Sequence, residues 1–279
     1  GENKMSSYNI YQTLCDVVEK AYPAEQYPNN AFTKFFVDIK VKEMKSIHGR
    51  YYPKTRKIEI FNLSRPNGHI VMTSLHEVAH HIDHCLRKDS DHTKVFYEVF
   101  HQLLLTAMGM GLVTTEDILT EDDSADKKRL EKHFGPVEEW EIPKQEYKKD
   151  RYVVKVYQSF SIKDKLKNRG YKYSSLEQAW TREINEDEVE EEKNTVAQWI
   201  DEKCIVVEQA NTMKIESYYY LCVSNCYDHR DYLKENGFRW NGYGVKKAWV
   251  KKIPTQSLQK EEAKLLHLAN IKVKVAAKK

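Results

Sequence analysis

Two histidines four residues apart form the most chemically suggestive feature of this chain. His76 and His80 enclose Glu77 in the sequence His-Glu-Val-Ala-His. On a helix, residues i and i+4 project from the same face, so two imidazole nitrogens can reach one ion at about 2 Å each. Glu77 can then accept a proton from a water molecule at that ion. The pattern favours a catalytic zinc site over a structural metal or a chance match.

A catalytic zinc site also needs a third protein ligand and one open position. His92 lies beyond the polar break at residues 88–91, at the start of the next predicted helix, and can fold back. Glu98 on that helix is the alternative, and His84 is less favoured because it lies one turn further along the first helix. His81 points about 100° round the helix from the second histidine. We therefore predict Zn²⁺ bound by His76, His80 and His92.

Other polar residues have secondary expected roles. Tyr97 and Tyr52 are candidates for stabilising the oxyanion of the reaction, although their positions do not follow from the sequence. Asp83 is either an acceptor for a hydrogen bond from a ligand or a surface charge. The predicted reaction is hydrolysis of a peptide bond, with Glu77 as the general base.

The elements that position these residues follow from the spacing of apolar side chains. Residues 69–86 show helical spacing, and residues 57–61 alternate apolar and polar as a strand does. Further expected elements are helices at 6–22 and 92–110, a strand at 35–39, and a turn at 48–50. Residues 114–150 are rich in Asp, Glu and Lys with few apolar positions, which predicts a partly helical connector.

The remainder of the chain contains an internal repeat, whose two copies align at a constant offset. Gly170 to Tyr173 match Gly237 to Trp240, and Ala179-Trp180 match Ala248-Trp249 after a short insertion. Each copy predicts strand, helix, Gly turn, two strands, helix and strand, which indicates duplication of a small module. The predicted domains are 1–115 (metal-binding), 116–150 (connector), 151–213 (first repeat) and 214–279 (second repeat).

Composition and charge limit the setting of the protein. The five cysteines are odd in number and suggest no disulfide framework, which favours a reducing, cytoplasmic location. No apolar run approaches the roughly 18 residues of a membrane helix. Residues 214–279 carry 14 basic and 6 acidic side chains. This surplus indicates either a polyanion partner or an ordinary lysine-rich surface.

The motifs of residues 30–110 resemble the SprT-like branch of the HExxH zinc metallopeptidases, the zincins. The resemblance rests on four segments: 49–52, 56–62, 76–80 and 92–96. It implies an active-site helix packed on a small sheet, with His92 as third ligand and Phe96 as an aromatic core anchor. Thr93 stands where the family usually has glycine. The resemblance also implies that strand 57–61 is an edge that pairs with extended substrate; its residues are Lys57, Ile58, Glu59, Ile60 and Phe61.

Two other zincin branches compete with this interpretation. The ImmA/IrrE-like and ArdC-like proteins also carry HExxH, and their third ligand is a downstream glutamate. Membership there would give that role to Glu98. The four-cysteine zinc ribbon of some SprT-like proteins is absent from the sequence, and the two repeats follow in its place.

Each repeat resembles a small module found beside phage and mobile-element nucleic-acid enzymes. Tyr171-Lys172-Tyr173 and Phe238-Arg239-Trp240 alternate aromatic and basic residues, so they could stack bases if exposed. Burial in the core is the favoured interpretation, above all for Trp180 and Trp249. The candidate phosphate contacts are Arg239, Lys246, Lys247, Lys251 and Lys252.

Together these observations predict an α+β protein with a zincin-like catalytic domain and two tandem α+β repeats. The expected function is a zinc endopeptidase that acts on a protein or peptide substrate, with repeats that recruit it to single-stranded DNA or to a partner. Two alternatives stay open: a nucleic-acid-binding protein with a structural metal, and a regulatory protease dedicated to one partner.

Overall fold

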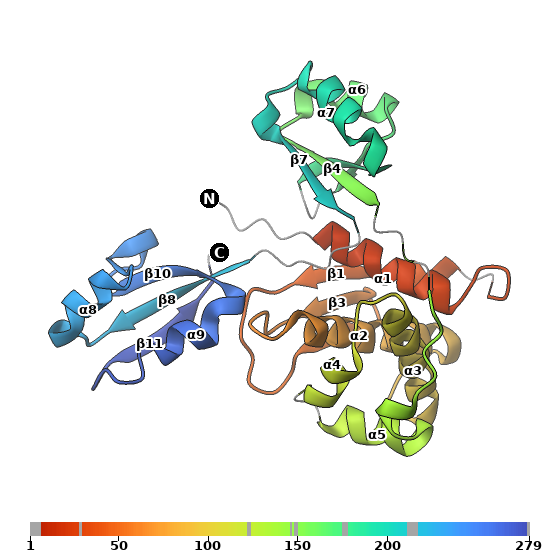
Figure 1. Ribbon diagram of the computed structural model, residues 1–279, viewed down its shortest axis with the longest axis horizontal. Helices are drawn as coiled ribbons and strands as arrows, with labels where there is room; N and C mark the ends of the chain where they lie inside the picture. Colours follow the sequence, from red (N-terminus) through yellow and green to blue (C-terminus); the bar gives the residue numbers. More distant parts are fainter. Residues whose placement is uncertain are drawn as a thin grey trace.

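The structure is a computed structural model that describes residues 7–27, 30–121, 124–145, 147, 150–174, 178–210 and 217–277. Helices and three small sheets alternate along these residues, which confirms the α+β class. Figure 1 shows an N-terminal unit from which two smaller units project in different directions. We call the smaller ones the middle unit (150–210) and the C-terminal unit (217–277).

The sheet of the N-terminal unit has three short strands in the order β1-β3-β2. They are β1 (Phe36–Ile39), β2 (Gly49–Tyr52) and β3 (Lys57–Ile60). A turn with Arg56 in the left-handed region (φ 55°) joins β2 to β3 as a hairpin. β1 pairs in parallel on the other side of β3. Residues Gly49 and Arg50, expected in a turn, therefore begin the edge strand β2.

This strand order corrects the prediction that residues 57–61 form an edge for substrate. The backbone of β3 pairs with β1 on one side and with β2 on the other, so it has no free edge. Ile58, Glu59 and Ile60 are buried, Lys57 is half-buried, and Phe61 lies just beyond the end of the strand. The edge that remains beside the histidine helix is β2.

Helix α2 (Asn67–Arg87) carries the HExxH sequence and packs between the sheet and α3 (Lys94–Gly109). Most of its surface is buried because apolar side chains face both the sheet and α3. They include Ile70, Val71, Leu75, Val78, Ala79 and Ile82. Lys88 ends α2 in the left-handed region, and its N–H donates to the carbonyl of His84. The first helix, α1 (Ser7–Ala21), contacts β1 and α3.

The charged segment after α3 belongs to the N-terminal unit, which corrects the expected connector. It forms α4 (Thr115–Thr120), α5 (Ser124–Phe134) and the short turn η2 (Val137–Glu139). Its few apolar side chains enter the same core as α2 and α3; they include Ile118, Leu130, Val137 and Trp140. The Tyr147 hydroxyl donates to Asp16 of α1, so the unit extends at least to that residue.

The middle and C-terminal units have equivalent sheets. The middle unit has β4 (Arg151–Tyr157), β5 (Lys172–Ser174), β6 (Ala179–Asn185) and β7 (Ile205–Gln209), in the order β5-β6-β4-β7. The C-terminal unit has β8 (Tyr218–Ser224), β9 (Arg239–Trp240), β10 (Trp249–Pro254) and β11 (Lys272–Ala276), in the order β9-β10-β8-β11. The helices are α6 (Lys163–Asn168), α7 (Val189–Ala197), α8 (Arg230–Glu235) and α9 (Leu258–Ala263).

The C-terminal unit is held against the loop that leads into α2. The side-chain amide of Gln256 donates to the carbonyls of Leu63 and Arg65, each at 2.9 Å. Val41 of the N-terminal unit packs against the apolar core of the C-terminal unit. Among the described residues, no helix is both long and apolar enough to cross a membrane.

Candidate metal centre

Three histidines converge with the geometry of a metal site. His92 Nε2 lies 3.2 Å from His76 Nε2 and 3.1 Å from His80 Nε2. Nitrogens at tetrahedral positions, each about 2.0–2.1 Å from a zinc ion, are separated by about 3.3 Å. His76 and His80 come from adjacent turns of α2, and His92 comes from the loop before α3. The three side chains could hold one metal ion.

The alternative ligands lie elsewhere. Glu98, the alternative third ligand, is exposed on α3 and is not part of this group. His84 is also outside it. His81 has a structural position: Tyr51 Oη lies 2.8 Å from its Nδ1, and Ala31 O lies 2.8 Å from its Nε2. The Thr93 backbone before α3 is extended (φ −84°, ψ 176°), a conformation that does not require glycine.

Asp126 of α5 orients the first histidine. Its Oδ2 lies 2.7 Å from Nδ1 of His76, and its Oδ1 accepts a hydrogen bond from the Tyr97 hydroxyl at 2.7 Å. Burial alone would raise the pKa of Asp126, but the hydrogen bonds from His76 and Tyr97 bring it below its ordinary value. An ionised Asp126 accepts a hydrogen bond from Nδ1–H of His76, and this tautomer leaves Nε2 with a lone pair for a metal.

A different network orients the second histidine. The Ser90 hydroxyl donates to Asp83 Oδ2 at 2.8 Å, and its oxygen lies 2.7 Å from Nδ1 of His80. Arg87 donates to both oxygens of Asp83, at 2.6 and 2.7 Å. Because Ser90 donates to Asp83, it accepts from His80. The Nε2 atom of His80 therefore also carries the lone pair that a metal requires.

Aromatic packing holds the two helical imidazoles in place, and burial keeps the imidazole of His80 neutral. Phe96 is fully buried; it stacks on the His80 ring at 4.3 Å between centroids and meets the His76 ring edge-on at 5.0 Å. Burial, with the nearby His76 and His92, lowers the pKa of His80 to about 3. A neutral imidazole at neutral pH is the form that binds a metal ion.

Glu77 lies in the wall of a cleft of about 670 Å³ that also contains the histidines. Its side chain is 6% exposed, and this burial raises its pKa to about 7. A Cβ atom on Gly49 of β2 would lie 2.9 Å from Thr73 Cγ2 and 3.0 Å from Glu77 Cγ. Only glycine lets β2 lie this close to the helix that carries Glu77. A general base works best with a pKa near the working pH.

The tyrosines proposed for the oxyanion lie in other positions. The Tyr97 hydroxyl is buried and donates to Asp126. The Tyr52 hydroxyl accepts a hydrogen bond from Arg50 at 3.2 Å, and Tyr52 does not line the cleft. The cations that do line the cleft are Arg50 and Arg129.

Three residues that contribute to this site were not identified as such from the sequence. Asp126 lies 50 residues from its partner, in the segment expected to be a connector. Ser90 lies in the polar break and has no motif. Gly49 was expected in a turn and noted in the resemblance, although a glycine at the start of a strand beside the helix that carries Glu77 is a signal of close approach.

The five basic residues proposed as phosphate contacts fall into two groups. Arg239, Lys246 and Lys247 are exposed around the β9–β10 hairpin. Lys251 and Lys252 lie on β10: Lys251 Nζ forms a 2.9 Å ion pair with Glu261, and Lys252 Nζ lies 4.4 Å from the centre of the Tyr218 ring. The structure therefore places only the first group together at the hairpin.

A scan against protein-family models found no match for this chain, and searches of curated proteins and of solved structures also found none.

Proposed function

We propose that this chain is a zinc-dependent endopeptidase whose N-terminal unit is a zincin-like catalytic domain of the SprT-like kind. The observation that carries the proposal is the convergence of three imidazole Nε2 atoms beside the buried carboxyl of Glu77, in one open cleft. Three histidines suit zinc, and a site of three protein ligands leaves one position for water or substrate. A structural site would more often be closed by a fourth protein ligand.

The chemistry divides between the ion and the chain. A zinc ion held there supplies Lewis acidity, which makes water a better nucleophile near neutral pH and polarises a carbonyl. Glu77 takes the proton of the attacking water and can pass it to the leaving amine. Asp126 and Ser90 hold the two helical histidines in the tautomer that presents Nε2.

The substrate is proposed to be a polypeptide in extended conformation. β2 pairs with β3 on one side and is the outer strand of its sheet. Its residues Gly49, Arg50 and Tyr51 line the cleft. A substrate strand that pairs with β2 would run past Glu77 and place a peptide carbonyl close to the metal position. This role passes to β2 from the segment 57–61.

The middle and C-terminal units are proposed to be duplicated modules that recruit the peptidase to single-stranded nucleic acid or to a partner protein. Their equivalent strand orders support duplication. All five cysteines are unpaired, which supports a reducing, cytoplasmic setting.

Glu77→Gln tests the proposal. The purified protein should bind one zinc ion per chain by elemental analysis, and the variant should retain it because the amide leaves the three imidazoles in place. Cleavage of a fluorescent unfolded casein should fall by about 100- to 10,000-fold, the usual contribution of a general base. Cleavage that survives the substitution contradicts the mechanism.

Glu98→Gln is the matched control, since it removes an exposed carboxylate from the neighbouring helix α3. It should change neither zinc content nor rate, and a loss of zinc would contradict the ligand set. If the wild-type protein binds zinc but leaves casein intact, the Glu77→Gln protein should capture a dedicated substrate that the wild type releases as fragments. Failure to cleave even the captured protein favours a structural metal.

A further inference from the structure

Large aromatic side chains are exposed at equivalent positions of the middle and C-terminal units. Phe160 is 78% exposed, and Tyr227, its counterpart at the offset of the repeat, is 77% exposed. Tyr173 is 55% exposed, and its counterpart Trp240 is 54% exposed. Tyr171 and Phe238, which lie just before β5 and β9, are buried instead because their side chains enter the cores of the two units. The expected burial therefore holds for Tyr171 and Phe238 but not for Tyr173 and Trp240.

Strand register confirms that the positions are equivalent. Tyr173 of β5 pairs across the strands with Trp180 of β6, and Trp240 of β9 pairs with Trp249 of β10. The two ring pairs have centroid separations of 5.5 and 5.9 Å. Trp180 and Trp249 are half-buried rather than enclosed in a core. Each unit therefore presents a pair of adjoining rings, of which one is largely open to solvent.

A cation accompanies the other exposed ring in each unit. Lys163 Nζ lies 4.2 Å from the centre of the Phe160 ring, and Arg230 Cζ lies 4.7 Å from the centre of the Tyr227 ring. Lys163 and Arg230 are themselves counterparts at the same offset. Residues 160–174 contain five basic and one acidic side chain, and residues 227–249 contain five basic and three acidic. The aromatic positions thus lie in locally positive segments, even though the middle unit is acidic elsewhere.

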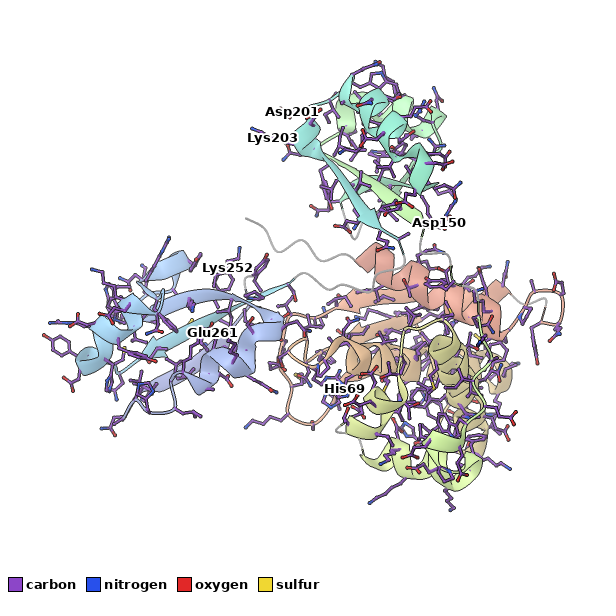
Figure 2. All side chains as sticks on the ribbon, in the orientation of Figure 1. His69, Asp150, Asp201, Lys203, Lys252 and Glu261 are labelled. Atoms are coloured by element: carbon purple, nitrogen blue, oxygen red, sulfur yellow. The ribbon has the colours of Figure 1, made fainter. Side chains whose placement is uncertain are left out.

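All of these residues belong to the end of each unit that points away from the N-terminal unit. In the middle unit, β4 ends at Tyr157 opposite Ala179, where β5 also ends, and Phe160 follows directly. Figure 1 shows α6 and α8 at the outer parts of their units. In Figure 2, Asp150 marks the near end of the middle unit and Lys203 its far side, while Lys252 and Glu261 lie in the nearer part of the C-terminal unit.

Folding does not explain this arrangement. Core positions persist between duplicated copies because packing requires them, but a ring that is more than half exposed adds little to a core. The two copies differ at most surface positions, yet they keep exposed aromatics and an adjacent cation at the same places. Retention of such a set between diverged copies points to a common ligand.

We propose that the outer end of each unit, here called its tip, binds single-stranded nucleic acid. Bases stack on Tyr173 and Phe160 in the middle unit and on Trp240 and Tyr227 in the C-terminal unit. Lys163 and Arg230 meet the neighbouring phosphates, as do Lys246 and Lys247 in the β9–β10 hairpin. Unpaired bases are required because duplex bases already stack on each other. The proposal deepens the recruitment part of the proposed function and is independent of peptide cleavage.

The test measures fluorescence anisotropy of a labelled oligothymidine of about 30 nucleotides, since one such platform covers roughly 4–16 nucleotides. The full chain with Glu77→Gln is used, so that peptide cleavage cannot affect the result. Each of Phe160→Ala, Tyr173→Ala, Tyr227→Ala and Trp240→Ala should weaken binding by about 5- to 150-fold, as expected for loss of one stacked base. Thermal unfolding should stay unchanged because these rings are exposed.

Phe36→Ala is the matched control. Phe36 is 57% exposed and lies 6.0 Å from the guanidinium of Arg56, but it belongs to the N-terminal unit. It should alter binding by less than about twofold. The pair Lys246→Ser with Lys247→Ser should reduce the slope of log affinity against log salt by about 1.4.

Three results would overturn the proposal: no binding of the oligothymidine at low salt, tip variants that bind as tightly as Phe36→Ala, or equal competition by duplex DNA. The first would leave a protein partner as the ligand of the tips. None of them bears on casein cleavage, so failure here is distinguishable from failure of the peptidase proposal.

Discussion

The two helical histidines lie one turn apart, yet they are supported by different parts of the chain. His76 depends on Asp126, which is 8% exposed and comes from α5, 50 residues away. His80 depends on half-buried Ser90 in the loop directly after its own helix. The first support is a charged acceptor that is held by tertiary packing. The second is a neutral hydroxyl that passes the hydrogen bond on to Asp83.

The candidate metal site therefore depends on local contacts at His80 and on long-range contacts at His76. A hydrogen bond to an ionised acceptor is roughly twice as strong as one between neutral groups. Zinc binding should therefore depend more on the support of His76 by Asp126 than on the support of His80 by Ser90, although each lies 2.7 Å from its histidine.

The largest effect is expected for Asp126→Asn. The amide keeps the shape of the side chain but loses the charge that His76 and Tyr97 face. Zinc affinity, measured by competition with a chromogenic chelator at pH 7, should fall by about 100-fold, the upper end for residues that support metal ligands. Glu131→Gln on the same helix is the control, since its carboxylate lies 3.8 Å from Lys127. An affinity loss of equal size in Glu131→Gln would assign the effect to α5 stability.

A smaller effect is expected for Ser90→Ala. The substitution removes the acceptor for His80 Nδ1, while Asp83 keeps both hydrogen bonds from Arg87. Zinc affinity should fall by about tenfold, the lower end of the same range. If Ser90→Ala weakens zinc binding more than Asp126→Asn does, the hydrogen bond from His80 to Ser90 matters more than the one from His76 to Asp126.

The same division between local and long-range contacts decides what the sequence could predict. The pair His76 and His80 follows from helical spacing, and His92 follows because the short polar break cannot carry the chain far from the end of α2. Asp126 could not be found, since nothing in a charged helix with one buried leucine, Leu130, indicates which face meets the core.

The prediction that residues 57–61 form an edge strand was wrong for a related reason. Alternation correctly places residues 57–60 in a strand with buried Ile58 and Ile60. It carries no information on whether β1 adds beside β3 or beside β2, because either choice buries apolar side chains. The addition of β1 to β3 left β2 as the edge beside Glu77. The repeat, by contrast, could be predicted because its two segments are compared within one sequence, and the two units have equivalent strand orders.

The smallest effect is expected at His101 of α3, whose ring packs against the end of α5. Its ring stacks on Phe134 at 3.9 Å and meets Trp140 edge-on at 4.6 Å. Burial lowers the pKa of His101 to about 4, below the ordinary value near 6.5. The unfolded chain therefore takes up this proton first as the pH falls. The stability that a neutral His101 provides is complete above about pH 6.5 and is lost progressively toward pH 4.

Replacement of His101 by phenylalanine should remove this pH dependence. The buried Nε2 of His101 has no hydrogen-bond partner among the described residues, so a phenyl ring can keep the stack without losing a bond. Urea unfolding of the zinc-free protein at pH 7 and pH 5 should show a smaller loss of stability for His101→Phe than for wild type. The difference should be modest because the ring is partly exposed. Equal losses would mean that the contact of α5 with α3 does not respond to this proton, and that the long-range support of His76 is insensitive to mild acid.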